Sequence, residues 1–413
     1  MSAAACRHSL RIGSRTLGSL PIAAPGQMRW LSSTPSLGKA VIHFQRTGSP
    51  ELKKILADLY EYVILPEYLT PEQRKKIYKK KYEKELVHNP ITVDIDGKKH
   101  EFRYRNLLTD KPSVKSGVTN AVTHMKTKGD FARNLFPLLE GCYSVAKLKP
   151  AGPDTFVKIT SRAGDAGAIG AVLECIYKSK QTKFYLQTHE LVNELFFQLQ
   201  RGAWESGWDR ETTEKGIRRI NKVLDLLESD PHHEALPDSG PAAYPFYRDP
   251  QFLAARLHLQ AALALRPRKD GKKKDEDAMT PEEEEELVAK YALEILRLWP
   301  PTFGLLDLRP DQVYRLRHGM MYLLRRRVFV WTAAPIVSAF RMARDVLSKD
   351  EKHAELVQAL EHTATQVEKE LAIALPQSIG SERAVGTYKA LFPDETLPQK
   401  AEKLPKEGRT VLE

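Results

Sequence analysis

The first fifty residues contain no acidic side chain, because the first Asp or Glu of the chain is Glu51. They also lack the apolar core of roughly 7–15 residues that a secretory signal needs. They do carry six Lys or Arg residues, several serines and short apolar stretches. An Arg-rich, Ser-rich and acid-free N-terminus is typical of a mitochondrial transit peptide. We predict a transit peptide over residues 1–33, processed near residues 29–33, and a mitochondrial matrix location; a disordered basic tail is the alternative.

Cysteine is scarce, with only Cys6, Cys142 and Cys175 in the chain. Cys6 leaves with the predicted transit peptide, and the other two lie too far apart for a disulfide framework or a metal-binding spacing. Their apolar neighbours predict two buried thiols. The longest uncharged stretch after residue 50 covers about thirteen residues, 328–340, and contains Pro335. That stretch is too short to span a bilayer, so we predict a chain that does not cross a membrane.

Catalytic motifs are also missing. The sequence has no phosphate-binding loop, no nucleophile elbow and no two-histidine zinc motif. Gly164, Gly167 and Gly170 recur every three residues, which does not match the dinucleotide-binding fingerprint. We therefore predict no catalytic residue, no metal, no cofactor and no small-molecule substrate, and we expect the protein not to be an enzyme.

Apolar residues and positive charge are plentiful. Hydrophobic residues make up 42% of the chain, enough to build a core, and the formal net charge is +11. Six of those positive charges precede Glu51, so the remaining chain keeps an excess of five. This milder excess fits an acidic partner such as RNA or an anionic lipid surface without demanding one.

The N-terminal region after the transit peptide, residues 34–110, is predicted to be a basic arm of helices and one β-hairpin. Ser49 and Thr70 each precede a proline and an acidic residue, which is a helix start signal. Residues 91–95 and 100–105 alternate between apolar and polar on either side of Asp96 and Gly97. Alternation around an Asp-Gly pair predicts a β-hairpin.

From Ser113 onward the apolar spacing is helical almost throughout. Helical hairpins recur at intervals of roughly 40–50 residues, which predicts an irregular, solenoid-like helical body over residues 111–376. A single irregular helical domain is the alternative, because the period is uneven. The tail, residues 377–413, is polar and contains several prolines, so we expect it to be extended over a partner; a disordered tail is the alternative. The predicted fold class is therefore mostly α, with a small N-terminal β-hairpin.

Two basic clusters are the candidate RNA-binding sites. The first lies on a helix predicted over residues 74–85 and interleaves seven basic residues with two tyrosines: Arg74, Lys75, Lys76, Tyr78, Lys79, Lys80, Lys81, Tyr82 and Lys84. Lysine and arginine neutralise phosphates, and tyrosine can stack on exposed bases. A solvated helix whose tyrosines face the body is the alternative interpretation.

The second cluster consists of Arg325, Arg326 and Arg327, the last three of five arginines that begin with Arg315 and Arg317. We predict it at the end of one helix over residues 311–327, whose buried face would contain Val313, Leu316, Met320 and Leu323. Arginine is suited to bidentate phosphate contacts. The cluster predicts a contact with rRNA or with an acidic protein; an ordinary solvated face is the alternative.

Residues 156–177 resemble one pentatricopeptide-type helical hairpin. An aliphatic helix ends in Arg162-Ala-Gly-Asp165, and the next helix carries Ala168, Ala171, Val172 and Leu173. Mitochondrial proteins built from such repeats bind RNA, one base per repeat. The resemblance covers one hairpin, and no base-reading residue is carried over from it.

The whole pattern resembles accessory proteins of the fungal mitochondrial small ribosomal subunit. The shared features are an Arg-rich presequence, a basic N-terminal helix and hairpin, an irregular helical body and proline-containing tails. The resemblance implies a structural constituent of the mitochondrial ribosome that contacts rRNA and neighbouring ribosomal proteins. Two alternatives stay open: a dissociable RNA-binding translational activator or RNA-stability factor, and a respiratory-complex assembly factor that needs no RNA.

Overall fold

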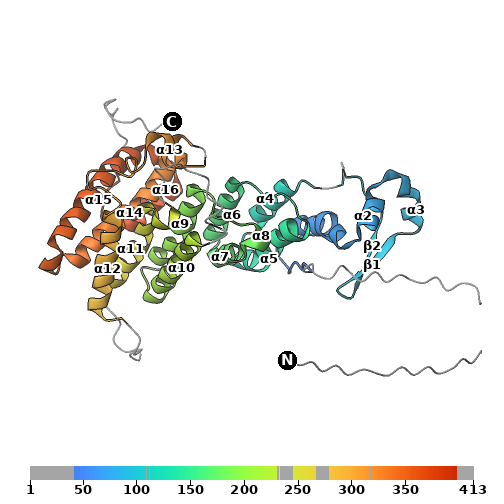
Figure 1. Cartoon of the computed structure of the whole chain (residues 1–413), viewed down its shortest axis with the longest axis horizontal. Coiled ribbons are helices and arrows are strands. Elements are labelled where there is room, and N and C mark those ends of the chain that lie inside the picture. The colour runs from blue at the N-terminus through green and yellow to red at the C-terminus, as the bar shows by residue number, and fades with distance from the viewer. Residues whose placement is uncertain are drawn as a thin grey trace, which may run out of the picture.

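The computed structural model describes residues 41–107, 109–110, 112–229, 232, 245–266, 279–316 and 318–397. The molecule is elongated, with its β-hairpin and two short helices at one end and a helical body at the other (Figure 1). Within the described residues, helices account for nearly all regular structure, and the only sheet is a two-stranded antiparallel hairpin. The predicted mostly α fold with an N-terminal β-hairpin is confirmed. The predicted transit peptide lies outside the described residues.

The N-terminal elements pack around a small hydrophobic cluster of their own. It includes Ile77, Leu86 and Phe102, each at most 1% exposed. The hairpin turns at Asp96 and Gly97, whose φ angles of 52° and 73° give the backbone of a type I′ turn. The elements in chain order are α1 (Pro50–Leu59), η1 (Tyr60–Ile64), η2 (Leu65–Tyr68), α2 (Pro71–Tyr78), η3 (Lys80–Tyr82), α3 (Glu83–His88), β1 (Ile91–Ile95) and β2 (Lys98–Phe102).

The body is a series of packed helices joined by short turns. Its first half consists of α4 (Val114–His124), α5 (Lys128–Glu140), η4 (Gly141–Val145), α6 (Pro153–Asp165), α7 (Ile169–Tyr177), α8 (Ser179–Thr182), α9 (His189–Glu205) and α10 (Arg210–Glu228). Its second half consists of η5 (Phe246–Arg248), α11 (Pro250–Ala264), α12 (Pro281–Leu296), α13 (Asp311–Arg315), η6 (Met321–Leu324), α14 (Arg326–Leu347), η7 (Glu351–His353), α15 (Ala354–Ala374), η8 (Pro376–Ser378) and α16 (Glu382–Leu391).

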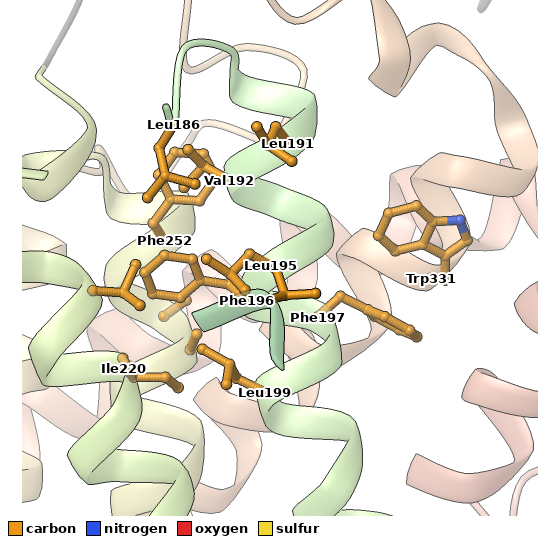
Figure 2. Packing of buried hydrophobic residues seen from close by; sticks show 14 of the residues in the cluster. Leu186, Leu191, Val192, Leu195, Phe196, Phe197, Leu199, Ile220, Phe252 and Trp331 are labelled. Carbon is orange, nitrogen blue, oxygen red and sulfur yellow. The ribbon is translucent and has the colours of Figure 1, made fainter. Parts of the chain in front are cut away.

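One continuous hydrophobic cluster joins the body's helices. It extends from Leu52 to Phe392, and Figure 2 shows its part around α9, where Phe197 packs on Trp331 and Phe196 stacks on Phe252. α11 and α14 are buried along nearly their whole length, so they form the centre of the second half. The predicted helical hairpins are present, but they share a single core.

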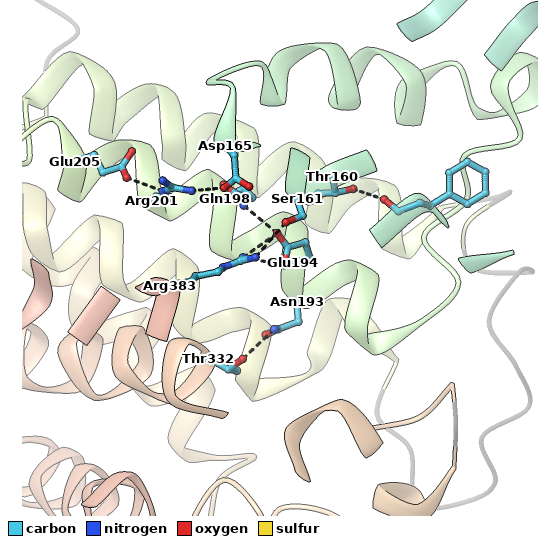
Figure 3. Close-up of polar contacts among 11 residues, drawn as sticks. Thr160, Ser161, Asp165, Asn193, Glu194, Gln198, Arg201, Glu205, Thr332 and Arg383 are labelled. Atoms are coloured by element: carbon cyan, nitrogen blue, oxygen red, sulfur yellow. Dashed lines mark hydrogen bonds and ion pairs between the residues drawn. The ribbon is translucent and has the colours of Figure 1, made fainter. Parts of the chain in front are cut away.

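Buried polar side chains tie α9, α11 and α14 together. The His258 ring on α11 lies 2.9 Å from the Gln200 amide oxygen on α9 and 3.0 Å from the Ser338 hydroxyl on α14. The Asn193 amide donates a 3.0 Å hydrogen bond to the Thr332 hydroxyl, which also joins α9 to α14 (Figure 3). Each of these groups would cost free energy if it were left buried without a partner, so the network fixes how the helices align.

The C-terminal segment is not extended where it was predicted to be. Residues 382–391 form α16, which packs on α14. The Arg383 guanidinium lies 4.3 Å from the ring centroids of both Phe197 and Trp331. It also donates a 2.8 Å hydrogen bond to the Glu194 carboxylate on α9 (Figure 3). These contacts join residues that are far apart in the sequence, so the local sequence pattern did not predict them.

Candidate nucleic-acid interface

The first basic cluster lies on a broken helix rather than on the single helix predicted for residues 74–85. α2 ends at Tyr78, Lys79 is extended with φ −100° and ψ 119°, and α3 begins at Glu83. In a continuous helix Ile77 and Leu86, nine residues apart, would point to opposite faces. The break turns both side chains into the same hydrophobic cluster. The need to bury both residues explains why the helix is interrupted.

Five lysines of this cluster point to solvent. Lys75, Lys79, Lys80, Lys81 and Lys84 are all exposed, and none forms an ion pair with any described residue. We call these five residues the lysine surface. Exposed cations without carboxylate partners remain available to an external anion.

The other two basic residues of the cluster already have partners. Arg74 pairs with Glu67 at 2.6 Å, and Lys76 lies 3.6 Å from Glu85. Their charges help to hold α2 against its neighbours and are partly neutralised there.

The two tyrosines pack against the protein. Tyr78 is half-buried against the small hydrophobic cluster, and burial raises the pKa of its phenol. The Tyr82 ring lies under two ammonium groups, with its centroid 4.7 Å from Lys81 Nζ and 5.5 Å from Lys76 Nζ. Both rings therefore support the surface that carries the lysines, as the alternative interpretation of the sequence expected.

Positive charge is concentrated around this cluster. Residues 71–105, which we call the basic unit, contain eleven Lys or Arg against six Asp or Glu, an excess of five. Residues 51–413 as a whole also have an excess of five, so the basic unit accounts for all of it. The hairpin contributes Lys98, Lys99 and, just after β2, Arg103, all exposed. The sequence did not indicate these three residues, because the basic cluster was defined along one predicted helix and the hairpin lies beyond it.

The second basic cluster lies elsewhere, at the start of α14 in the body. Arg325 forms an ion pair with Glu190 at the start of α9, and Arg326 also has an interaction within the chain. Arg327 is exposed, and the structure gives it no partner among the described residues. The structure therefore does not bring the two predicted clusters together into one surface (Figure 1).

The helix predicted over residues 311–327 is wrong. α13 ends at Arg315, and Leu316, expected to be buried, is 53% exposed. The backbone folds back, and the Met320 amide donates a 3.1 Å hydrogen bond to the Val313 carbonyl. A Cβ at Gly319 would lie 2.6 Å from that carbonyl oxygen, so only glycine permits this turn.

Three further features concern possible metal ligands, the cysteine thiols and membrane crossing. The described residues contain no group of three or more His, Cys, Asp or Glu side chains that could hold a metal ion. Cys142 and Cys175 are free and buried, as predicted, and burial raises the pKa of the Cys142 thiol to about 12. A thiol with that pKa stays protonated and unreactive at neutral pH. None of the described helices combines the length and apolarity needed to cross a membrane.

Comparison with known proteins gives a family. A family model described as mitochondrial ribosomal protein mS27 matches residues 29–390 of this chain. A curated protein from Neurospora crassa, small ribosomal subunit protein mS27, is 38% identical over 379 residues, which cover 91% of this chain and 94% of that protein. The chain therefore belongs to the mitochondrial ribosomal protein mS27 family, and it is a structural protein of the mitochondrial small ribosomal subunit rather than an enzyme.

Proposed function

We propose that the lysine surface is the chain's principal rRNA contact in the small subunit. The observation that carries this proposal is the set of five exposed lysines without an ion pair to any described residue, on a unit that holds the whole charge excess of residues 51–413. Phosphates attract such a surface whatever the RNA sequence, because the interaction is mainly the release of counterions. The hairpin residues Lys98, Lys99 and Arg103 extend the same unit.

The packing beneath the lysines supports this role. Ile77 and Leu86 anchor α2 and α3 in the small cluster, so the backbone that carries the lysines is fixed before any RNA arrives. A preformed surface loses less conformational entropy on binding than a flexible tail does. We assign the Arg325–Arg327 cluster a smaller part, since Arg325 is already paired with Glu190.

We also propose that the protein works in the mitochondrial matrix. The acid-free, Arg-rich N-terminus supports import, since such segments are read by the import machinery and then removed. Protease protection in mitochondria with ruptured outer membranes tests this location: a matrix protein stays intact until the inner membrane is opened. Digestion before that point would contradict the proposal.

The rRNA contact is tested by reversing three charges. The variant Lys79→Glu/Lys80→Glu/Lys81→Glu should bind small-subunit rRNA more weakly than the unmodified chain does. The slope of log affinity against log salt should become shallower by about two to three, because each phosphate contact contributes about 0.7–0.9. Fluorescence anisotropy with the full chain over a range of salt concentrations measures both quantities.

A matched control changes the same amount of charge on the body. Lys158, Lys180 and Lys389 are exposed and have no ion pair to described residues, so the reversal of all three mimics the charge change without touching the basic unit. This variant should keep most of the salt slope. Equal slopes for the two triple variants would overturn the proposed role of the lysine surface, because net charge alone would then explain binding.

A further inference from the structure

A groove with a volume of about 400 Å³ lies between α7, α9 and α10, with the start of α5 at its edge. Much of its wall consists of small residues, among them Gly167, Gly170, Gly202 and Ala203. A Cβ at Gly167 or Gly202 would meet nothing within 4 Å, which means that these positions face open space. A wall without side chains lets another backbone approach closely. In Figure 1, α7 and α10 lie on the same side of the body, each below the helix that precedes it.

Cations surround this groove. Lys128, Lys215 and Arg219 are among its lining residues. Arg219 is half-buried, and it forms neither an ion pair nor a hydrogen bond with any described residue. One of its terminal nitrogens lies 3.6 Å from the position that a Cβ at Gly170 would take, so the guanidinium sits against the groove wall. Burial lowers the pKa of this guanidinium, and the nearby Tyr177 opposes that shift only in part.

A second arginine, near the groove, differs from Arg219 in this respect. Arg201 on α9, close to the groove, pairs with Asp165 at 2.7 Å and with Glu205 at 2.6 Å. The carboxylate that lines the groove, Glu174, is 3.0 Å from Lys178 and is therefore already paired. A half-buried arginine without a carboxylate, in a hollow, fits a carboxylate that comes from outside the chain.

The chemistry of the wall favours a peptide over RNA. Glycine and alanine present apolar surface and backbone, whereas a sugar–phosphate chain is bound mainly by dense positive charge. A short extended peptide needs one well-placed cation for each acidic side chain, and Arg219 offers a bidentate partner.

We propose that this groove receives an acidic, extended segment of a neighbouring ribosomal protein, with one of its carboxylates paired to Arg219. Lys128 and Lys215 would attract further acidic residues at the edge of the groove. This proposal rests on the chain being a protein of the small subunit, but it does not depend on the lysine surface. The lysine surface lies on the basic unit, at the far end of the molecule (Figure 1). The two proposals can therefore fail separately.

Site-specific crosslinking in the assembled small subunit tests the proposed occupant. A p-benzoylphenylalanine placed at Gly202 points into open space and should leave the fold intact. The subunit is purified, irradiated and digested, and the crosslinked partner is identified by mass spectrometry. The expected result is a crosslink to a segment of another ribosomal protein that contains Asp or Glu. A crosslink to rRNA, to a segment without an acidic residue or to this chain alone would overturn the proposal, and so would no crosslink.

Two charge reversals on α10 sharpen the test. Arg219→Glu should lower the crosslink yield about tenfold, because it replaces a charge-assisted hydrogen bond with a like-charge contact. Arg218→Glu makes the same change at the next position, which is exposed and is not part of the groove lining, and it should leave the yield unchanged. Equal yields for the two variants would overturn the assigned role of Arg219 even if a protein segment were captured.

Discussion

The paired arginines of the helical body and the exposed lysines of the basic unit have different roles. In the body, Arg309 pairs with Asp249 at 2.6 Å, and both side chains are at most 2% exposed. Arg341 likewise reaches Glu368 and Glu395, at 2.7 and 2.5 Å. In the basic unit, by contrast, the five lysines of the lysine surface are exposed and have no ion pair to described residues.

This difference separates stability from binding. A buried ion pair fixes the arrangement of the helices, because loss of one partner leaves the other charged and desolvated. An exposed lysine contributes little to the folded state, so its charge is free for a partner. Variants in the body should therefore change the free energy of unfolding, and variants on the lysine surface should change association.

The largest expected effect is on the buried pair of the body. Asp249→Ala removes the carboxylate that faces Arg309 and also the N-cap of α11, which accepts a hydrogen bond from the Gln251 amide. We expect the free energy of unfolding to fall by roughly 3–5 kcal/mol, the usual result of breaking a buried pair. Urea denaturation followed by circular dichroism measures it. The exposed pair Glu174–Lys178 is the control, and a similar loss for Glu174→Ala would contradict the comparison.

A comparable change in the basic unit should act locally. Ile77 is fully buried in the small cluster, so Ile77→Ala should destabilise that cluster by roughly 2–5 kcal/mol. Hydrogen exchange should then lose protection in α2, α3 and the hairpin while α11 and α14 keep theirs. Equal loss of protection in α11 and α14 would show that the unit and the body unfold together.

Acid should destabilise the body through two buried histidines. Burial lowers the pKa of His258 to about 3 and that of His189 to about 4. In the unfolded chain both histidines have the ordinary pKa of about 6.5, so just below that pH they are protonated in the unfolded state but not in the folded state. The free energy of unfolding therefore has its full value above pH 6.5 and decreases as the pH falls. The two residues should lower the free energy of unfolding by about 2 kcal/mol in total between pH 6.5 and 5.5.

Replacement of one histidine isolates its share of that pH dependence. His258→Gln keeps a hydrogen-bonding side chain beside Gln200 and Ser338 but cannot titrate. In this variant only His189 of these two histidines still titrates. The loss of about 2 kcal/mol between pH 6.5 and 5.5 should therefore fall to about half, as measured by urea denaturation at the two pH values. An unchanged pH dependence would show that His258 does not stay neutral in the folded body.

The smallest effect on stability is expected from the lysine surface itself. Lys79→Glu/Lys80→Glu/Lys81→Glu should change the free energy of unfolding by no more than about 0.5 kcal/mol, because exposed positions without an ion pair contribute little to folding. Thermal unfolding of the purified chain checks this value. A loss of several kcal/mol would mean that these lysines stabilise the fold of the unit. Unfolding of the unit, rather than loss of phosphate contacts, would then explain weaker RNA binding.

Local signals predicted the local elements. The helix start at Thr70 is a capping box, and the Asp96-Gly97 turn joins the two strands. The predicted division of the chain into an arm (34–110), a body (111–376) and a tail (377–413) remains a prediction.

The failures have a common physical reason. The break at Lys79 serves to bury Ile77 and Leu86 together, and the turn at Gly319 depends on a close backbone approach. Arg383 and Glu194 are 189 residues apart in the chain, so no periodicity could have paired them. The groove around Arg219 arises where α7, α9 and α10 meet, and a single helix pattern contains no signal for it.

The most direct test of the central claim is sedimentation of the lysine variants with the ribosome. Mitochondrial lysates that contain the unmodified chain, the Lys79–Lys81 triple reversal or the Lys158, Lys180 and Lys389 triple reversal are run on sucrose gradients in Mg²⁺ and in EDTA. We expect the unmodified chain and the control to follow the intact ribosome in Mg²⁺ and the small subunit in EDTA. The Lys79–Lys81 variant should move toward the top of the gradient as salt rises. Retention of that variant on the small subunit at every salt concentration would contradict the claim that the lysine surface holds the chain on rRNA.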